Sequence, residues 1–538
     1  MSKRYKPDFK MMRLSFQQSS GFRALIFLWF TFLAVSLACS RADVESPGGV
    51  GSGGIAAPTT SIVTPVDPPG KTATIETPMV ATSTPEFLEP VASPTFPPTP
   101  TSESIDTGES LLYESQPGDS IRTLAIRFGV IPDDIESPEP LPSEKDLIDP
   151  GQLLIIPNRL VDVGPSEKLL PDSEIIFSPH ATDFDVTAFA REQGGYLNKY
   201  QEIVDGFWRP GPEVVEIVAL DNSINPRILL ALLEYRSGWV TDPSVPSGDA
   251  FIYPLGVKDE RNQGLRRQLT WLASELGNGY YGWRSATLTD LKFSDRSTLR
   301  IAPDLNAGTV AIQYILSLFH DRPVWDQAIN ENLFLGTYTN LFGEPWEYEY
   351  QIFEPGVIQP DLILPFLLNH IWAFTGGPHG AWERESAWAA LDFAPATSVT
   401  GCAVSEDWVT ASAPGIVVRS EDGTVVLDLD GDGREQSGWA LLYLHIAEEG
   451  RVEAGTFVEQ GDLIGHPSCE GGIATGTHAH IARKYNGEWI LADGPIPFEL
   501  SGWVTRAGTK PYQGVLVKDG EEVIACPCAS YQTLISRE

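Results

Sequence analysis

Residues 471–484 read GGIATGTHAHIARK and place two histidines, His478 and His480, one residue apart in a segment with the pattern of a strand. The whole chain has eight histidines. Side chains alternate between the faces of a strand, so residues two apart point the same way, with Cα atoms roughly 6.5–7 Å apart. At that spacing one imidazole can hold a metal ion while the other faces a molecule beside it. The alternative is a pair of surface histidines on an edge strand.

A strand pattern continues around this segment. The stretch 408–446, WVTASAPGIVVRSEDGTVVLDLDGDGREQSGWALLYLHI, alternates apolar and polar positions between turns rich in Gly and Asp. Alternation with a period of two indicates β-strands. We therefore expect an all-β domain over residues 365–538, with the two histidines inside it.

Three more side chains with suitable chemistry lie in the same region. The stretch 376–395, GGPHGAWERESAWAALDFAP, contains His379 and Asp392, and YLHI at 443–446 contains His445. A hydrolytic zinc site uses three protein ligands of the His, Asp or Glu type and leaves a fourth position to water. Two further groups then remain to move a proton or to stabilise an oxyanion.

The order of these motifs resembles the lysostaphin/LytM-type zinc endopeptidases that cut bacterial cell-wall peptides. The resemblance covers roughly residues 370–495 and includes APGIVV (413–418), GTFVEQGDLIG (455–465) and ATGTHAHI (474–481). It implies an all-β peptidase domain with a Zn²⁺ cofactor, whose water has a pKa lowered towards about 7. The residues it implies are the metal ligands His379, Asp392 and His480 and the catalytic pair His445 and His478.

The chain departs from this family in one spacing. Thirteen positions separate His379 from Asp392, where the family usually has four. We expect AWERESAWAA (381–390) to be a loop inserted between the two ligand-bearing ends, because lengthening a loop adds little closure entropy. His466 is a further candidate ligand, and a decayed domain that keeps its fold without zinc is the alternative for the whole site.

A short module is expected at residues 110–158. YESQPGDSIRTLAIRFGVIPDDI (113–135) predicts a strand, a turn that caps a helix, and the helix itself, and LIDPGQLLIIPN (147–158) predicts a second turn and a closing strand. These segments resemble a LysM domain, a βααβ module that binds glycans rich in N-acetylglucosamine. The glycan contacts that the resemblance implies are Gly118, Asp119, Ser120, Ile121, Pro150 and Gly151. The alternative is a packing domain that has lost its ligand.

Residues 185–350 are predicted to be helical. INPRILLALLEYRSGW (224–239) and LNAGTVAIQYILSLF (305–319) carry apolar residues at helical spacing. They resemble a lysozyme-like transglycosylase in which Arg236 stands where the family has its catalytic glutamate, so the resemblance implies a degenerate domain that binds glycan or acts as a spacer. A glycosidase that uses Glu234 and an unrelated helical domain are the alternatives.

The N-terminus predicts export. Basic residues precede the apolar run ALIFLWFTFLAVSLA (24–38), which suits a signal-peptide core. Residues 1–39 end at Cys39 and resemble a bacterial lipobox, in which the cysteine is lipidated. Cleavage near Ala38 or Ala42 is the alternative. Residues 40–108, rich in Pro, Thr, Ser and Gly, are expected to form a disordered stalk.

Smaller signals concern cysteine and aspartate. In an exported protein we favour a disulfide between Cys402 and Cys469, because Cys526 and Cys528 would close a very small ring. DLDGDG (428–433) begins like a calcium loop, but Trp439 stands where the bidentate acid is needed, so a solvated hairpin tip is favoured.

The sequence thus predicts a multidomain, exported zinc endopeptidase of the cell envelope that hydrolyses peptide bonds of peptidoglycan. A LysM module would hold it to glycan, and a lipid on Cys39 would anchor it to the outer face of the cytoplasmic membrane. The net charge of −35 argues against nucleic acid as a partner. The alternative function is a non-catalytic peptidoglycan-binding scaffold or an activator of a cell-wall amidase.

Overall fold

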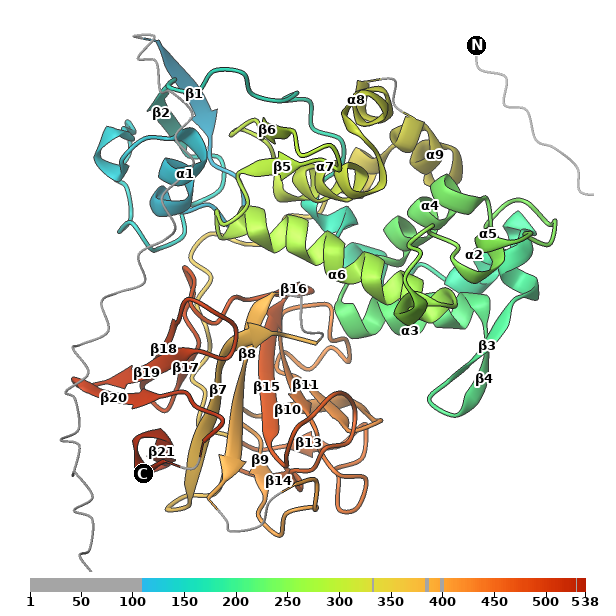
Figure 1. Ribbon diagram of the computed structural model, residues 1–538. Coiled ribbons are helices and arrows are strands. Elements are labelled where there is room, and N and C mark those ends of the chain that lie inside the picture. The colour runs from blue at the N-terminus through green and yellow to red at the C-terminus, as the bar shows by residue number, and fades with distance from the viewer. Residues whose placement is uncertain (1–108, 331–332, 383–386, 397–400, 529) are drawn as a thin grey trace, which may run out of the picture. The chain divides into compact units, whose positions relative to one another are not determined.

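The computed structural model describes residues 109–330, 333–382, 387–396, 401–528 and 530–538. The predicted signal peptide, stalk and lipidated Cys39 lie outside these described residues. Within them, no helix combines the length and the apolar character needed to cross a membrane. Along the chain, a small module of two strands and a helix is followed by a helical region and then by a region of strands (Figure 1).

The N-terminal module pairs β1 (Ser110–Glu114) with β2 (Leu153–Pro157) in an antiparallel ladder and places α1 (Ile121–Phe128) between them. Ser120 caps α1 by accepting a hydrogen bond from Thr123 N. The expected second α-helix of a βααβ module is absent from this described segment, which has only the 3₁₀ turn η1 (Pro132–Asp134). The βααβ prediction was wrong here, because prolines soon after this turn deny backbone donors to a longer helix.

The helical region contains eight α-helices and two small hairpins among the described residues. The helices are α2 (Val186–Gln193), α3 (Gly211–Asn222), α4 (Pro226–Ser237), α5 (Asp249–Ile252), α6 (Leu265–Arg284), α7 (Ala307–Phe319), α8 (Arg322–Asn330) and α9 (Leu333–Phe342). The hairpins are β3 (Gln201–Val204) with β4 (Phe207–Pro210) and β5 (Asp290–Lys292) with β6 (Thr298–Arg300).

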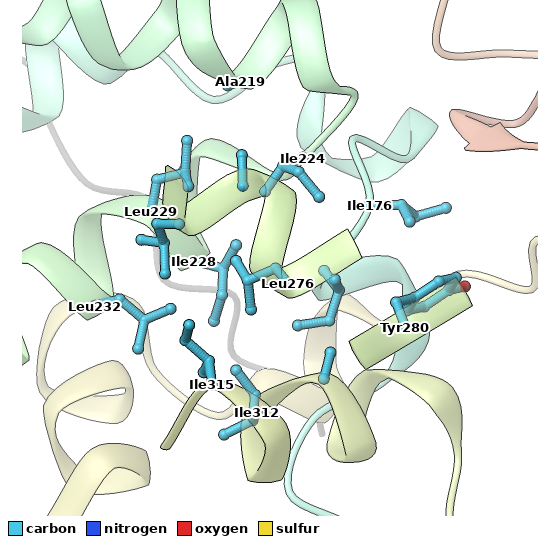
Figure 2. Packing of buried hydrophobic residues seen from close by; sticks show 14 of the residues in the cluster. Ile176, Ala219, Ile224, Ile228, Leu229, Leu232, Leu276, Tyr280, Ile312 and Ile315 are labelled. Carbon is cyan, nitrogen blue, oxygen red and sulfur yellow. The ribbon is translucent and has the colours of Figure 1, made fainter. Parts of the chain in front are cut away.

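Helix α4 lies in the centre of the helical region. Asn225 caps its start, Pro226 fills a first-turn position that needs no N–H group, and Gly238 ends it in the left-handed conformation with φ of 68°. Its side chains belong to the same buried cluster as those of α6 and α7, which includes Ile228, Leu276 and Ile312 (Figure 2). Truncating such a buried side chain to Ala costs about 2–5 kcal/mol.

The C-terminal region is mainly β, as the sequence predicted. Its large antiparallel sheet has the order β13-β10-β11-β12-β15-β8-β7-β21, with β16 attached to β15. These strands are β7 (Ile371–Gly380), β8 (Trp388–Pro395), β10 (Gly415–Glu421), β11 (Thr424–Asp428), β12 (Trp439–Leu444), β13 (Phe457–Val458), β15 (Ala479–Tyr485), β16 (Glu488–Trp489) and β21 (Leu534–Ser536).

Two smaller sheets flank the large one. One pairs β9 (Val409–Thr410) with β14 (Leu463–Gly465). The other has the order β17-β18-β19-β20 and contains β17 (Glu499–Leu500), β18 (Trp503–Ala507), β19 (Gly514–Lys518) and β20 (Glu521–Ile524). Isolated 3₁₀ turns complete the described elements: η2 (Asp172–Glu174), η3 (Pro179–Ala181), η4 (Tyr196–Lys199), η5 (Glu260–Asn262), η6 (Pro345–Tyr348) and η7 (Tyr531–Thr533).

The central strands of the large sheet are buried on both faces. Leu441, Tyr443 and Ile481 belong to the core within the β region, whereas Leu442 and Ala482 belong to the cluster that also contains the helical core. Burial on both faces explains why WALLYL is apolar at nearly every position. The same strands carry the polar side chains described next.

Candidate metal centre

Three neighbouring strands bring His379, Asp392 and His480 together. β15 pairs with β8 in a register that sets His480 directly opposite Asp392. β8 also pairs with β7, and shifts in that register at Gly376 and His379 carry the end of β7 over the same position. Opposite residues in an antiparallel pair share a face of the sheet, so the three side chains meet.

The three side chains converge on one small volume. Asp392 Oδ1 lies 3.2 Å from His379 Nε2 and 3.2 Å from His480 Nδ1. The two imidazole nitrogens lie 3.1 Å apart. Ligand bonds of about 2 Å around a tetrahedral ion would set the ligand atoms about 3.3 Å apart. The spacing of the three atoms therefore suits a single small cation.

Backbone carbonyls fix the protonation of both imidazoles. His379 Nδ1 lies 2.8 Å from Gly377 O, and His480 Nε2 lies 2.8 Å from Ala381 O. A carbonyl oxygen only accepts hydrogen bonds, so each of these nitrogens is the N–H donor. In the neutral rings the opposite nitrogens then carry lone pairs, and those are the ones that face Asp392.

The donor set fits a bound metal ion. Asp392 Oδ1 is buried and has no hydrogen-bond partner. In the neutral rings, two imidazole lone pairs and a carboxylate oxygen thus face one another, which is unfavourable unless a proton or a metal ion lies between them. Two His and one Asp are ligands of the type found in zinc sites with an open position.

The pKa shifts of His379 and Asp392 also indicate that a positive charge is favoured at this place. Burial alone would lower the pKa of His379, but the Asp392 carboxylate outweighs it and raises this pKa above its usual value. Burial would raise the pKa of Asp392, but the surrounding imidazoles hold it well below its usual range. Asp392 therefore stays ionised and favours a positive charge beside it, either a proton or a metal ion.

His445 and His478 lie beside this group, with their ring centroids 4.5 Å apart. Their Nδ1 atoms donate hydrogen bonds to Glu470 O at 2.8 Å and Gly476 O at 2.7 Å, so their Nε2 atoms are the free nitrogens of the neutral rings. His478 Nε2 lies 3.6 Å from Asp392 Oδ1. The structure therefore brings together all five side chains that the sequence singled out in this domain.

His445 has two unusual properties. Burial and the neighbouring His478 and His480 lower its pKa to about 3, so the ring is neutral near pH 7. Its φ of 66° lies in the left-handed region, which non-glycine residues rarely adopt. The turn after β12 thus holds a neutral imidazole in a conformation that the rest of the fold imposes.

A disulfide braces the loops around His445 and His478. Cys402 is bonded to Cys469, next to the carbonyl of Glu470 that fixes His445. On the other side, Thr477 N donates to Gly401 O at 2.8 Å. Cys526 is also bonded to Cys528, so the argument that a small ring disfavours this pair was wrong.

The spacing between His379 and Asp392 has a simple structural origin. The two residues lie on paired strands of the β7–β8 hairpin, and Trp388–Ala390 belong to β8. The expectation that all of 381–390 is a loop was therefore wrong at its end. The segment also has a role that the sequence did not predict: Ala381 O accepts a hydrogen bond from His480 Nε2 and so fixes the tautomer of that ring.

Other contributors to the site were missed by the sequence. Gly377, Ala381, Glu470 and Gly476 act through their carbonyl oxygens, which every residue type possesses, so no sequence signal marks them. Tyr512 stacks on the His379 ring with centroids 4.1 Å apart and planes at 21°. It comes from the β18–β19 connection, far along the chain.

Two other histidines of the domain lie outside this group. His466 stacks on Trp408 with ring centroids 3.8 Å apart, and its Nδ1 bonds to Asp407 O. His370 Nδ1 lies 3.4 Å from Asp407 Oδ1. Among the described residues, the groups of metal-binding type are His379, Asp392 and His480 and the acidic group Asp428, Asp430 and Asp432.

The acidic group forms the turn after β11. The Asp428 carboxylate accepts hydrogen bonds from the backbone N–H groups of Asp430, Gly431 and Gly433 at 3.1, 3.1 and 2.8 Å. Asp428 thus holds the turn together, and Asp430 and Asp432 are exposed.

In the helical region, the Glu234 carboxylate accepts hydrogen bonds from Val240 N and Thr241 N at 2.9 and 3.1 Å. It caps the chain after α4, and this use of its oxygens argues against a free catalytic acid.

In the N-terminal module, the predicted glycan contacts Gly118, Asp119, Ser120 and Ile121 are buried, whereas Pro150 is half-buried and Gly151 exposed.

Comparison with known proteins supports a protease-like chain. Residues 168–355 match the family described as LasA, N-terminal domain. The chain is 25% identical over 350 residues to Protease LasA of Pseudomonas aeruginosa strain UCBPP-PA14, covering 60% of this chain and 75% of that protein. It is also 25% identical over 353 residues to Protease LasA of strain PAO1, with the same coverage.

The comparison with solved structures found matches to parts of the chain. The M23 metalloprotease pseudoalterin from the deep sea has 21% identity and a TM-score of 0.26, over 31% of this chain and 96% of that one. The catalytic domain of lysostaphin from Staphylococcus simulans has 22% identity and a TM-score of 0.17, over 22% of this chain and 84% of that one. The LysM and lysozyme-like resemblances stay predictions.

Proposed function

We propose that this chain is an exported, zinc-dependent endopeptidase that hydrolyses peptide bonds of bacterial peptidoglycan. The observation that carries the proposal is the convergence of His379 Nε2, Asp392 Oδ1 and His480 Nδ1, three buried acceptor atoms 3.1–3.2 Å apart. The similarity to Protease LasA supports a peptidase. The choice of cell-wall peptides rests on the motifs in 413–418, 455–465 and 474–481.

His379, Asp392 and His480 would hold the ion, which supplies a Lewis acid for the scissile carbonyl and lowers the pKa of a bound water. The Nδ1 atoms of His445 and His478 are held by the backbone carbonyls of Glu470 and Gly476, so their Nε2 atoms are the ones left to contact a substrate or water. A ring that takes a proton there becomes a donor, able to stabilise an oxyanion or to return the proton to the leaving amine. The backbone carbonyls keep both rings in this tautomer throughout.

The location of this activity is proposed from the part of the chain before residue 109. A signal peptide would export the protein, and lipidation of Cys39 would hold it at the outer face of the cytoplasmic membrane. The stalk of 40–108 would let the β region reach the wall, and the N-terminal module would bind its glycan strands. The net charge of −35 is consistent with a partner that is not a polyanion.

The test is release of new amino groups from purified peptidoglycan by the full chain. We expect release that stops with 1,10-phenanthroline and returns with added Zn²⁺. His480→Ala should lose both bound zinc and release. The matched control is His466→Ala, since His466 lies in the same region but outside the group, and it should keep both.

The outcomes separate the proposal from its rival. Normal release by His480→Ala would refute a metal centre at this position. A chain that binds zinc and pellets with the wall but releases no amino groups would favour the non-catalytic scaffold or amidase activator.

A further inference from the structure

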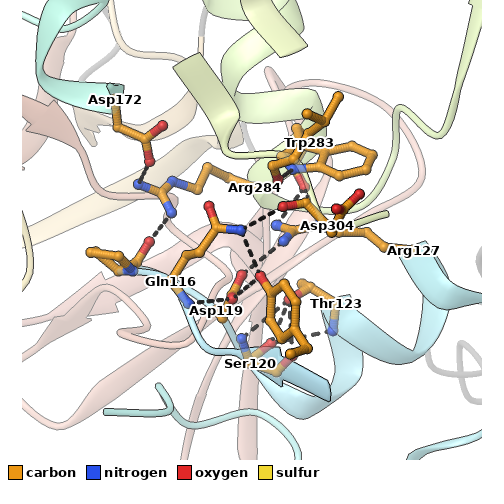
Figure 3. Close-up of polar contacts among 12 residues, drawn as sticks. Gln116, Asp119, Ser120, Thr123, Arg127, Asp172, Trp283, Arg284 and Asp304 are labelled. Carbon is orange, nitrogen blue, oxygen red and sulfur yellow. Dashed lines mark hydrogen bonds and ion pairs between the residues drawn. The ribbon is translucent and has the colours of Figure 1, made fainter. Parts of the chain in front are cut away.

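The loop of residues 116–120, which joins β1 to α1, lies against the helical region (Figure 3). Gln116 Nε2 donates a hydrogen bond to Asp304 O at 2.9 Å. Arg284, the last residue of α6, donates from Nη1 to Pro117 O. Its guanidinium leaves no room for a Cβ at Gly118, whose φ of 88° also favours glycine. We call this segment the docked loop.

A second set of contacts holds the helix that follows the docked loop. Arg127 donates from Nε and Nη2 to Trp283 O at 3.2 and 2.9 Å, and its guanidinium lies 4.7 Å from the Trp283 ring centroid. From the other side, Arg300 Nη2 donates to Ile126 O at 3.0 Å and to Arg127 O at 2.8 Å. The cation of Arg300 therefore lies at the carboxyl end of α1, where it is favourable.

The polar groups of the docked loop are already used. Asp119 accepts hydrogen bonds from Tyr113 Oη and Arg127 Nη1, each at 2.7 Å. The Ser120 hydroxyl caps α1. Both residues are nearly inaccessible, with 1% and 2% of their surface exposed. The Asp119 carboxylate and the Ser120 hydroxyl are therefore buried and engaged by Tyr113, Arg127 and Thr123.

Arg284 extends the junction to the β region. Its Nη2 lies 2.9 Å from Asp172 Oδ2 and 3.2 Å from Glu488 Oε2. Glu488 belongs to β16, which pairs with β15, the strand that carries His480. One buried side chain thus contacts the N-terminal module, the helical region and the sheet of the candidate metal centre.

We propose that the docked loop closes the glycan-binding groove of the N-terminal module, so that glycan and the end of α6 compete for the same surface. This proposal rests on the glycan-binding part of the proposed function. The module binds the wall only when it leaves α6, and Arg284 and Arg300 are the side chains that hold it closed. Closure keeps the chain off the wall until a high local glycan density releases the module.

Competition makes a quantitative prediction. When only a fraction of molecules is open, the apparent dissociation constant is the intrinsic one divided by that fraction. Weakening the closed state raises the open fraction and tightens glycan binding without any change in the module itself. By the same linkage, bound glycan must weaken docking by an equal factor.

The test uses the full chain and N-acetylchitopentaose as the probe, measured by isothermal titration calorimetry. Arg300→Met is the first variant, because among the described residues the Arg300 guanidinium donates hydrogen bonds to α1 and to Asp290 and not to the β region. Arg284→Met is the second. Both keep an apolar stem but remove the guanidinium, and both lie outside the module. The control is Arg261→Met, an arginine of the helical region whose side chain is 88% exposed.

We expect either variant to bind the probe at least about tenfold more tightly than the unmodified chain, and the control to bind unchanged. Amide exchange at residues 116–121 should be slow in the unmodified chain and should accelerate in Arg300→Met and with the probe. This second readout reports docking even if Arg284→Met folds poorly.

Three outcomes would overturn the proposal. Equal and measurable binding by all four chains would show that the groove is open, and glycan binding would stand without closure. No binding by any chain would remove both closure and the glycan-binding role, while leaving the amino-group release assay of the metal centre intact. Tight binding in which the amides of 116–121 stay protected would show that glycan binds elsewhere.

Discussion

Strand β15 carries two buried polar clusters four residues apart, and they are built in opposite ways. At Lys484 the charges balance: Lys484 Nζ lies 2.6 Å from Glu435, which also pairs with Arg419 at 3.0 Å, and Arg419 pairs with Asp221 at 2.9 Å. At His480 they do not, since three acceptor atoms converge and Asp392 Oδ1 has no donor.

The difference separates a structural cluster from a functional one. Two cations and two anions balance in charge at Lys484, and the network joins the β region to α3 through Asp221. Acceptors without a donor at His480 are tolerated only if something positive completes them. Removing a negative charge should therefore cost less folding stability at His480 than at Lys484.

The largest effect is expected from Asp392→Asn. Loss of the carboxylate should remove bound zinc and lower peptidoglycan cleavage by at least about 10⁴-fold, which corresponds to more than about 5 kcal/mol. The metal-free protein should lose less stability than Glu435→Gln costs, because the amide keeps the shape and adds a donor for the imidazole nitrogens. Amino-group release and urea unfolding in chelator measure the two quantities. Marked destabilisation of the metal-free variant would contradict an unbalanced cluster.

Glu435→Gln tests the balanced cluster. It leaves Arg419 and Lys484 buried with one carboxylate between them, so the free energy of unfolding should fall by about 3–5 kcal/mol. Urea denaturation measures this change. A loss below about 1 kcal/mol would mean that the network does not hold the sheet to α3.

Metal removal comes next in size. A ligand that binds only the folded state at 100 times its dissociation constant stabilises that state by about 2.7 kcal/mol. Chelation should therefore lower the stability of the unmodified chain by about 2–3 kcal/mol and leave that of Asp392→Asn unchanged, as thermal unfolding with and without chelator would show. An equal shift in both chains would place the metal elsewhere.

The smallest effect is expected from an exposed ion pair. Arg322 Nε lies 2.8 Å from Asp326 Oδ1 across one turn of α8, and both side chains are about one-third exposed, at 32% and 40%. Asp326→Ala should cost less than about 0.5 kcal/mol in urea denaturation. If Asp326→Ala lowered the free energy of unfolding as much as Glu435→Gln does, burial would not explain why the two ion pairs differ in stability.

The sequence predicted much of this arrangement because its signals were local. Period-two alternation identified the mainly β region, and the order of the histidine motifs singled out His379, Asp392, His445, His478 and His480, which the structure brings together. Their roles stay proposals. The alternation expected over residues 478–480 was enough to place His478 and His480 at one site, although β15 itself begins at Ala479.

The parts of the site that the sequence did not predict depend on contacts between segments that are far apart in the chain. No pattern marks Ala381 O as the partner of His480 or Tyr512 as the neighbour of His379, because backbone carbonyls are common to all residues and the tyrosine lies in another sheet. The docked loop lies against Arg284 and Asp304, which are far along the chain from it. A family resemblance describes the N-terminal module by itself and does not predict which other parts of the chain it contacts.

Zinc K-edge X-ray absorption of the full chain is the most direct test of the central claim. We expect a four-coordinate shell of nitrogen and oxygen with the outer-shell scattering of two imidazoles, and loss of this spectrum in Asp392→Asn. Sulfur ligands, a shell of water oxygens alone, or an unchanged spectrum in Asp392→Asn would contradict it.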